Sequence, residues 1–260
     1  MTDDILSPVL QDLLDSVPES GPVSTGTARY AEGDSELEGY FAHPVGADGP
    51  RPGVLVLHDW FGMSDHVRVR AQMLARLGYV ALAGDVYGAD VEVTDGGEAQ
   101  AQAGRFYGDP ALFRARVKAN LEALRADPAV DSSRIAVMGY CFGGSGALEL
   151  ARTGEEAAGF VSFHGNLTSG APAEADSIAS PILVLTGADD PVVPPEAVVA
   201  FEDEMRAGGA DDWQIVSYSG ALHAFAVPGT NSPEHGAAFD ATANRRSWRA
   251  MRDFFDEVFA

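Results

Sequence analysis

The stretch GYCFGG, residues 139–144, follows the apolar run Ile135–Met138 and leads into a helical run at Ala147–Ala151. A short apolar run bounded by glycine is typical of a buried strand, so the chain is predicted to turn here from strand to helix. Glycines must flank Cys141 because side chains there would collide with the strand and the helix. The turn would present the thiol at a sheet edge, near a helix N-terminus that favours the thiolate.

Strands and helices are predicted to alternate on both sides of this turn. The other expected strands are Val54–Leu57, Tyr79–Ala83, Phe160–Phe163, Ile182–Leu185 and Ile215–Tyr218, preceded by a hairpin of Thr27–Tyr30 with Leu37–Ala42. Helical spacing of apolar residues marks 67–77, 113–124, 198–205 and 248–258. This alternation predicts an α/β fold, with a mostly parallel, doubly wound sheet and helices on both faces. Ligands usually bind where the carboxyl ends of such strands meet.

The chain length of 260 residues suits one large domain, expected over residues 25–260. Residues 1–24 are acidic and rich in proline. Leu6, Leu10 and Leu13 have the spacing of a short amphipathic helix. We therefore expect either a loosely ordered N-terminal arm or a short helix docked on the domain.

The charge balance is strongly acidic, with 39 acidic against 17 basic residues and a net charge of -22. Such a field repels nucleic acid and anionic membranes, which excludes both as partners. The first residues lack a basic start and an apolar run, so a cytoplasmic location is expected. The acidity indicates either a salt-adapted source or simply an acidic bacterial protein. Nothing in the sequence indicates an oligomeric state.

The chain has a single cysteine, Cys141. An internal disulfide and a multi-cysteine metal site are therefore excluded. A free cysteine is often a small core residue, so the alternatives are a structural residue and a functional thiol. The residues that accompany Cys141 decide between these two interpretations.

Two partners follow later strand ends. Asp190 lies in GADDPVVP, residues 187–194, directly after one expected strand, and is preferred to Asp189 by its position in the loop. Either aspartate could instead cap the next helix. His223 lies in the loop after the last strand. The order Cys141, Asp190, His223 matches the nucleophile, acid and base of α/β hydrolases, and the backbone N–H of Phe142 is placed to serve an oxyanion hole.

The remaining histidines give no metal signal. No pair has the i, i+4 spacing of a helical zinc site, so neither a metal nor a cofactor is expected. His43 and His235 are expected at the surface. His164 ends a predicted strand and is either a pocket residue or a structural histidine.

Taken together, these motifs resemble those of the dienelactone hydrolase family, cysteine-dependent α/β hydrolases that open lactones. The similarity spans roughly residues 27–258. The matching stretches are GYCFGG (139–144), GADDPVVP (187–194), ALHAF (221–225), VLHDWFGM (56–63) and RRSWRAMRDFF (245–255). The resemblance implies that Cys141 attacks the carbonyl and that His223 acts first as base and then as acid. It also implies that Asp190 orients the imidazole of His223. It also implies that the backbone N–H groups of Phe142 and Trp60 hold the oxyanion.

The chain departs from the family at two positions. Asp59 stands where the family has a glutamate that contacts the resting thiol, so Asp59 is a candidate modulator of the thiol. Val227 stands four residues after His223, where dienelactone-cleaving members carry an arginine for the substrate carboxylate. Valine cannot bind a carboxylate, so a more neutral ester or lactone is expected. The candidate pocket residues are Tyr140, His164, Phe225 and Arg105.

The expected activity is hydrolysis of a small ester or lactone in two steps, through a thioester on Cys141. Two alternatives come from other classes of function. One is a non-catalytic binding protein on the same scaffold, because fold alone does not prove chemistry. The other is a redox-sensing thiol, which would not need Asp190 or His223.

Overall fold

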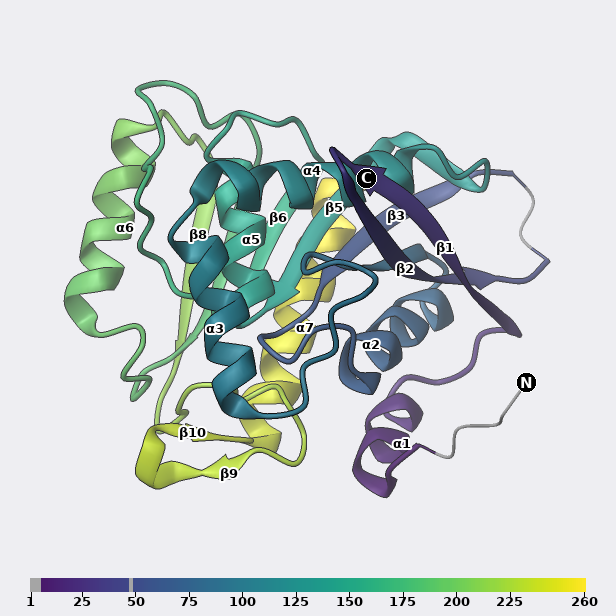
Figure 1. Ribbon diagram of the computed structural model, residues 1–260, viewed down its shortest axis with the longest axis horizontal. Helices are drawn as coiled ribbons and strands as arrows, with labels where there is room; N and C mark the ends of the chain where they lie inside the picture. The colour runs from purple at the N-terminus through teal and green to yellow at the C-terminus, as the bar shows by residue number, and fades with distance from the viewer. Residues whose placement is uncertain (1–5, 47–48) are drawn as a thin grey trace.

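The computed structural model describes residues 6–46 and 49–260, and its centre is a sheet of eight strands (Figure 1). In chain order these strands are β1 (Val23–Glu32), β2 (Ser35–Pro44), β3 (Arg51–Leu57), β4 (Val80–Gly84), β5 (Val130–Tyr140), β6 (Gly159–Phe163), β7 (Ile182–Gly187) and β8 (Trp213–Tyr218). Their order across the sheet is β1-β2-β4-β3-β5-β6-β7-β8. Strands β4, β3, β5, β6, β7 and β8 pair in parallel, whereas β1 with β2 and β2 with β4 pair antiparallel. The predicted mostly parallel sheet is therefore confirmed.

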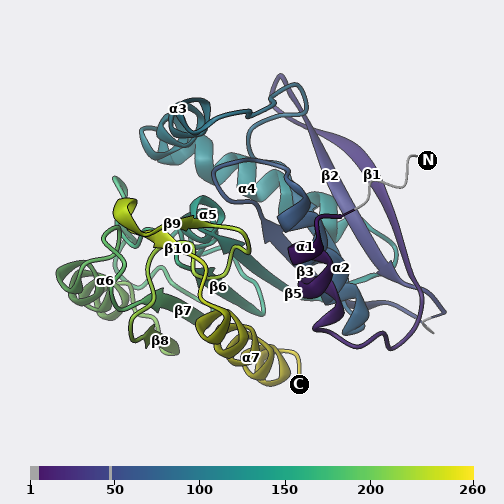
Figure 2. The ribbon, with the colours of Figure 1, turned by 90° about the horizontal axis from the view of Figure 1, so that it is seen from below.

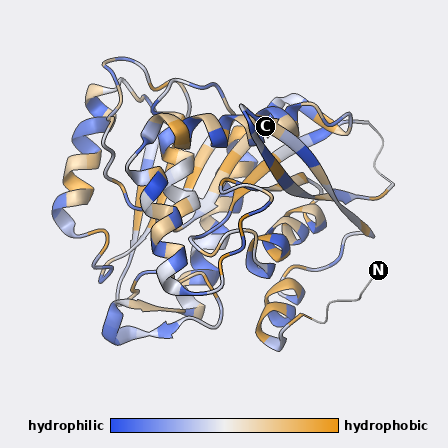
Figure 3. Ribbon diagram, viewed as in Figure 1, coloured by the Kyte–Doolittle hydropathy of each residue, from blue (hydrophilic) through white to orange (hydrophobic). Residues whose placement is uncertain are grey.

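Helices cover both faces of this sheet, as Figures 1 and 2 show. They are α1 (Pro8–Asp15), α2 (Asp65–Arg76), α3 (Gly96–Tyr107), α4 (Pro110–Arg125), α5 (Phe142–Ala151), α6 (Pro195–Ala207) and α7 (Ala241–Val258). Successive side chains of a strand point to opposite faces. In β3, Val54 and Val56 pack in one core with α2 and α7, whereas Leu55 and Leu57 pack in the other with α4 and α5. Figure 3 shows the central strands as mostly hydrophobic, as a sheet buried on both faces must be.

Two parts of the fold differ from the sequence prediction. Helix α3 occupies a stretch for which no element was predicted, and Asp95 caps it by accepting the N–H groups of Gly97 and Glu98. After β8 the chain forms a small two-stranded sheet. It consists of β9 (Asn231–Ser232) and β10 (Ala237–Ala238), joined by a 3-10 helix at Pro233–His235. Both additions lie near the carboxyl edge of the main sheet and help to build the candidate site.

Helix α1 packs on α2. Leu13 and Leu14 are buried, and Arg76 donates hydrogen bonds to the carbonyl groups of Leu14 and Val17. Residues 1–5 of the expected N-terminal segment lie outside the described residues. Within the described ranges, no helix is long and apolar enough to span a membrane.

Candidate active site

Cys141 occupies the single-residue turn between β5 and α5. Its backbone angles are φ 51° and ψ -115°, a conformation that L residues rarely adopt. A Cβ atom added to Gly139 would overlap the carbonyl of Gly143, and one added to Gly143 would overlap the carbonyl of Leu57. Since these neighbours are backbone atoms, they cannot move aside. The glycines therefore permit the turn that presents the thiol.

The structure brings Cys141, His223 and Asp190 into one line of hydrogen bonds. His223 Nε2 lies 3.1 Å from Cys141 Sγ, and His223 Nδ1 lies 2.9 Å from Asp190 Oδ2. The other carboxylate oxygen of Asp190 accepts the N–H of Val192 at 2.8 Å. Asp190 is buried, whereas its neighbour Asp189 is exposed. A histidine thus lies within hydrogen-bond reach of the thiol, and a carboxylate lies within reach of the histidine, as an activated cysteine nucleophile requires.

The charges around His223 favour its protonated form. Burial alone would lower the pKa of His223, but the Cys141 thiolate and the hydrogen bond to Asp190 outweigh burial and raise it to about 10. The imidazolium form therefore persists through neutral pH. A positive charge next to the sulfur stabilises the thiolate, which is the nucleophilic form of cysteine.

Two backbone N–H groups near the thiol are free to bind an anionic oxygen. Phe142 is the first residue of α5, where the N–H has no partner within the helix. Across the described part of the chain, neither the N–H of Phe142 nor that of Trp60 donates to a protein acceptor. The Trp60 carbonyl is fixed by the Tyr87 hydroxyl at 3.0 Å. Phe142 and Trp60 both line the cavity that contains Cys141, as an oxyanion hole would require.

The cavity around Cys141 and His223 has a volume of about 1000 Å³ and a largely apolar wall. Its apolar side chains include Val9, Trp60, Phe61, Tyr107, Val192 and Val227. They come from α1, the loop after β3, α3 and the loops after β7 and β8. No lysine or arginine is among the described residues that line it. The contributions of α1 and α3 were missed from the sequence.

The four candidate pocket residues do not line this cavity, so that prediction is corrected. Tyr140, His164 and Phe225 are fully buried beneath the site. Arg105 is exposed on α3, two residues from Ala103 and Tyr107, which do line the cavity. Residues four apart share a helix face, so the residue between them points away.

His164 lies behind the line of hydrogen bonds formed by Cys141, His223 and Asp190. Its ring centroid is 5.4 Å from that of His223, and its Nδ1 accepts the N–H of Cys141 at 3.2 Å. Burial, and then the charge of His223, lower the pKa of His164 well below its ordinary value. His164 is therefore neutral and can accept this hydrogen bond.

Asp59 lines the cavity but directs its carboxylate to neighbours other than the thiol. One oxygen accepts the N–H of Phe61 at 2.9 Å, and the other lies 3.4 Å from His66 Nδ1. Burial would raise the pKa of Asp59, but the contacts with His66 and Phe61 lower it overall. Asp59 thus remains an anion that fixes the loop carrying Trp60.

Comparisons with known proteins indicate the family to which the chain belongs. Residues 37–259 match the model of the dienelactone hydrolase family. A crystal structure titled as a dienelactone hydrolase-like promiscuous phosphotriesterase, P91, from metagenomic libraries is 42% identical, with a TM-score of 0.86. The alignment covers 92% of this chain and 100% of that one. An Escherichia coli K12 protein named "Putative carboxymethylenebutenolidase" is 26% identical over 92% of this chain and 89% of its own length. The chain therefore belongs to the dienelactone hydrolase family.

Proposed function

We propose that the protein hydrolyses a small, neutral ester or lactone, with Cys141 as nucleophile, His223 as acid and base, and Asp190 as the group that orients the imidazole. The observation that carries this proposal is the contact of 3.1 Å between His223 Nε2 and Cys141 Sγ in a cavity of about 1000 Å³. Family membership supports the hydrolase class.

In the first step the Cys141 thiolate adds to the carbonyl carbon of the substrate. The negative charge that develops on the carbonyl oxygen is held by the N–H groups of Phe142 and Trp60, a stabilisation that typically contributes roughly 3–4 kcal/mol per donor. The imidazolium of His223 gives its proton to the departing alkoxide. The products of this step are an alcohol and a thioester on Cys141.

In the second step His223 has to act as a base. Formation of the thioester removes the negative charge of the sulfur, which is one of the contributions that raise the pKa of His223. Burial then weighs more heavily and lowers this pKa. The neutral imidazole can therefore take a proton from water, and the hydroxide attacks the thioester and releases the acid.

The lining of the cavity supports a neutral, apolar substrate. Val227 takes the place of the family arginine and lines the cavity, whose described lining contains no cationic residue other than histidine. Trp60 and Phe61 are partly exposed at the wall and offer apolar surface to a bulky group. A substrate carboxylate would have no arginine to bind and would lie near Asp59.

An activity screen on p-nitrophenyl esters, aryl esters and lactones tests this proposal. Turnover of neutral esters is expected, with near-complete loss in Cys141→Ala and a large loss in His223→Ala. The screen also includes a phosphotriester, because the 42% identical relative is named a promiscuous phosphotriesterase. Full esterase activity in Cys141→Ala would overturn the proposal.

Turnover by the unmodified chain, and its dependence on Asp190, separate the two alternative functions. A binding protein on this scaffold would bind ligands without turnover in the unmodified chain. A redox-sensing thiol would react with peroxide but would show no dependence of ester turnover on Asp190. The buried carboxylate of Asp190, 2.9 Å from His223, supports catalysis over both.

A further inference from the structure

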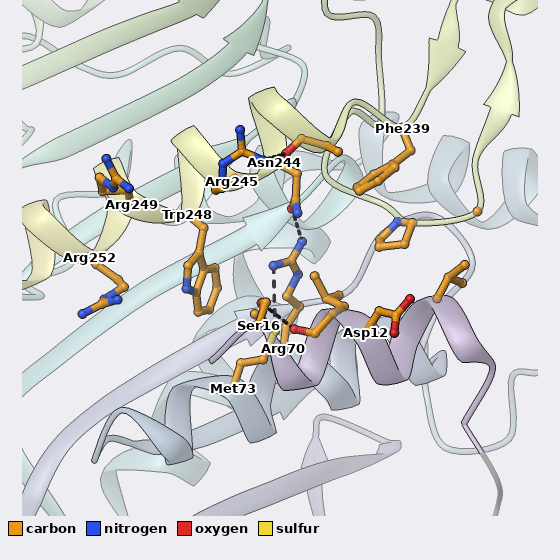
Figure 4. Close-up of a pocket in the computed structure, with 15 residues that line it drawn as sticks. Asp12, Ser16, Arg70, Met73, Phe239, Asn244, Arg245, Trp248, Arg249 and Arg252 are labelled. Atoms are coloured by element: carbon orange, nitrogen blue, oxygen red, sulfur yellow. Dashed lines mark hydrogen bonds between the residues drawn. The ribbon is translucent and has the colours of Figure 1, made fainter. Parts of the chain in front are cut away.

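A second cavity, of about 520 Å³, lies between α1, α2 and α7 (Figure 4). Its wall includes four arginines, Arg70, Arg245, Arg249 and Arg252. The chain as a whole has 39 acidic and 17 basic residues, so this is an unusual local concentration of positive charge. Val9, Pro228 and Gly229 line both this cavity and the one around Cys141. The two cavities therefore lie next to each other.

Three of these arginines share one face of α7. Arg249 and Arg252 each precede an aspartate by four positions, a spacing at which helical ion pairs commonly form. Nevertheless, neither they nor Arg245 forms an ion pair with a carboxylate of the described residues. By contrast, Arg76 on α2 pairs with Asp15 and Glu19. The guanidinium groups of α7 are thus free to bind an anion.

The inner wall of this cavity also carries polar groups without anionic partners. Arg70 is fully buried and donates to the carbonyl of Ala226 and to Asn244 Oδ1, both at 2.7 Å, but it forms no ion pair with a described carboxylate. The indole of Trp248 is 8% exposed, and its Nε1–H has no acceptor among the described residues. Figure 4 shows Arg70 and Trp248 pointing into the space between α7 and α1. A buried donor is expected to have an acceptor.

We propose that this cavity is a binding site for an organic carboxylate with an apolar body. The carboxylate would accept hydrogen bonds from Arg249, Arg252 and the Trp248 N–H. The apolar body would pack on Met73 and Phe239, which also line the cavity. Asp12 lies in the same wall and opposes the bound anion. This site is separate from the catalytic proposal and does not depend on it.

Isothermal titration of the full chain with 3-phenylpropionate tests this site, with the neutral 3-phenylpropionamide as matched ligand. The double variant Arg249→Ala/Arg252→Ala is expected to weaken binding of the acid by about tenfold or more. Asp12→Asn should strengthen it, because one opposing charge is removed. Arg246→Ala is the matched control, since Arg246 lies on the same helix but does not line the cavity.

A second measurement tests whether the acid binds instead in the cavity around Cys141. The titration is repeated on protein alkylated at Cys141 with N-ethylmaleimide, which adds a bulky group to the thiol in that cavity and leaves the residues that line this one unmodified. Binding of the acid should persist after alkylation. The proposal is overturned if the acid does not bind, if the amide binds equally well, if alkylation abolishes binding, or if Arg246→Ala weakens it as much as the double variant does.

Discussion

At the scale of single residues, the site is held by backbone conformations that L residues rarely adopt. Cys141, His164 and Ala224 all have positive φ angles although none is glycine. Strained backbone of this kind persists only where the surrounding structure imposes it, and it often accompanies function. Here it holds the thiol, the neutral His164 and the His223 loop in one arrangement.

The first prediction concerns pH. The pKa of His223 is raised from 6.5 to about 10, so the imidazolium, which protonates the leaving group in the proposed mechanism, is lost only as the pH rises through about 10. The alkaline limb of kcat/KM should therefore lie near pH 10. The raised pKa of His223 also contributes to the free energy of unfolding. This contribution is fully present below pH 6.5 and is lost as the pH rises through about 10.

Asp190→Asn provides the control for this profile. It removes a contribution that raises the pKa of His223 while burial remains, so the alkaline limb should move to lower pH. Initial rates across a pH series, with a check of folding by circular dichroism, give both profiles. An alkaline limb near pH 6.5 in the unmodified chain would contradict the charge distribution described here.

A second prediction concerns specificity at position 227. Val227→Arg places a guanidinium in the cavity around Cys141, so under the proposed function the ratio of kcat/KM for a carboxylate-bearing ester to that for its neutral analogue should rise by about tenfold. Val199→Arg is the control, because Val199 is exposed on α6 and does not line the cavity. An unchanged ratio in Val227→Arg would show that position 227 does not contact the substrate.

That Cys141, Asp190 and His223 lie close together could be expected from the sequence, because each follows the end of a parallel strand and such ends meet at one edge. The sequence was not sufficient for the pocket wall. Whether Arg105 or Tyr107 faces the cavity depends on the rotation of a helix whose existence was not predicted. Tyr140, next to Cys141, points into the opposite core because successive strand residues alternate.

At the scale of elements, α5 packs so closely on β5 and on the end of β3 that a Cβ atom at Gly139 or Gly143 would overlap backbone atoms. We predict that Gly143→Ala lowers the free energy of unfolding by about 1–3 kcal/mol, because the new Cβ overlaps the carbonyl groups of Leu57 and His58. It should also abolish turnover, since the Cys141 turn has to shift. Urea denaturation and initial rates measure the two effects.

Gly104→Ala on α3 is the matched control. A Cβ atom there would meet no other atom within 4 Å, and alanine favours a helix. This variant should raise the free energy of unfolding by about 0.4–1 kcal/mol and keep its activity. If Gly143→Ala were as stable as Gly104→Ala, the close-packing explanation of the turn would be wrong.

Helix α3 itself could have been predicted from a local signal. Asp95 precedes Glu98 by three positions, and Glu98 accepts hydrogen bonds from Thr94. An acceptor followed three residues later by glutamate is typical of a helix N-terminus. The glycines at 96 and 97 obscured this signal because glycine disfavours helix. Helix α1 was expected only as one of two alternatives, since its burial depends on docking against α2.

At the scale of the whole molecule, the net charge of -22 acts on stability. Self-repulsion among acidic groups destabilises a compact state, and salt screens it over a Debye length that falls from roughly 30 Å at 0.01 M to roughly 3 Å at 1 M. We therefore predict that the Tm rises with sodium chloride. Thermal unfolding followed by circular dichroism measures this, with sucrose at matched osmolality as control. A Tm that is indifferent to salt would remove the hypothesis of a salt-adapted source.

The order of strands and helices was predictable because buried parallel strands leave a clear apolar pattern. The cavity lined by arginines was not predictable, since Arg70 on α2 and Arg249 on α7 meet only in the folded chain. We propose that residues 25–260 form a single α/β-hydrolase domain on which α1 docks. The family match over 37–259 supports the larger part of this proposal.

The central claim is that Cys141 carries the acyl group during turnover. Rapid acid quench of the enzyme with a p-nitrophenyl ester, followed by peptide mass spectrometry, tests it most directly. We predict one acyl group on the peptide containing Cys141, discharged over the time of one turnover, and no acyl group in Cys141→Ala. Turnover with the acyl group on another residue, or undiminished turnover in Cys141→Ala, would contradict the account.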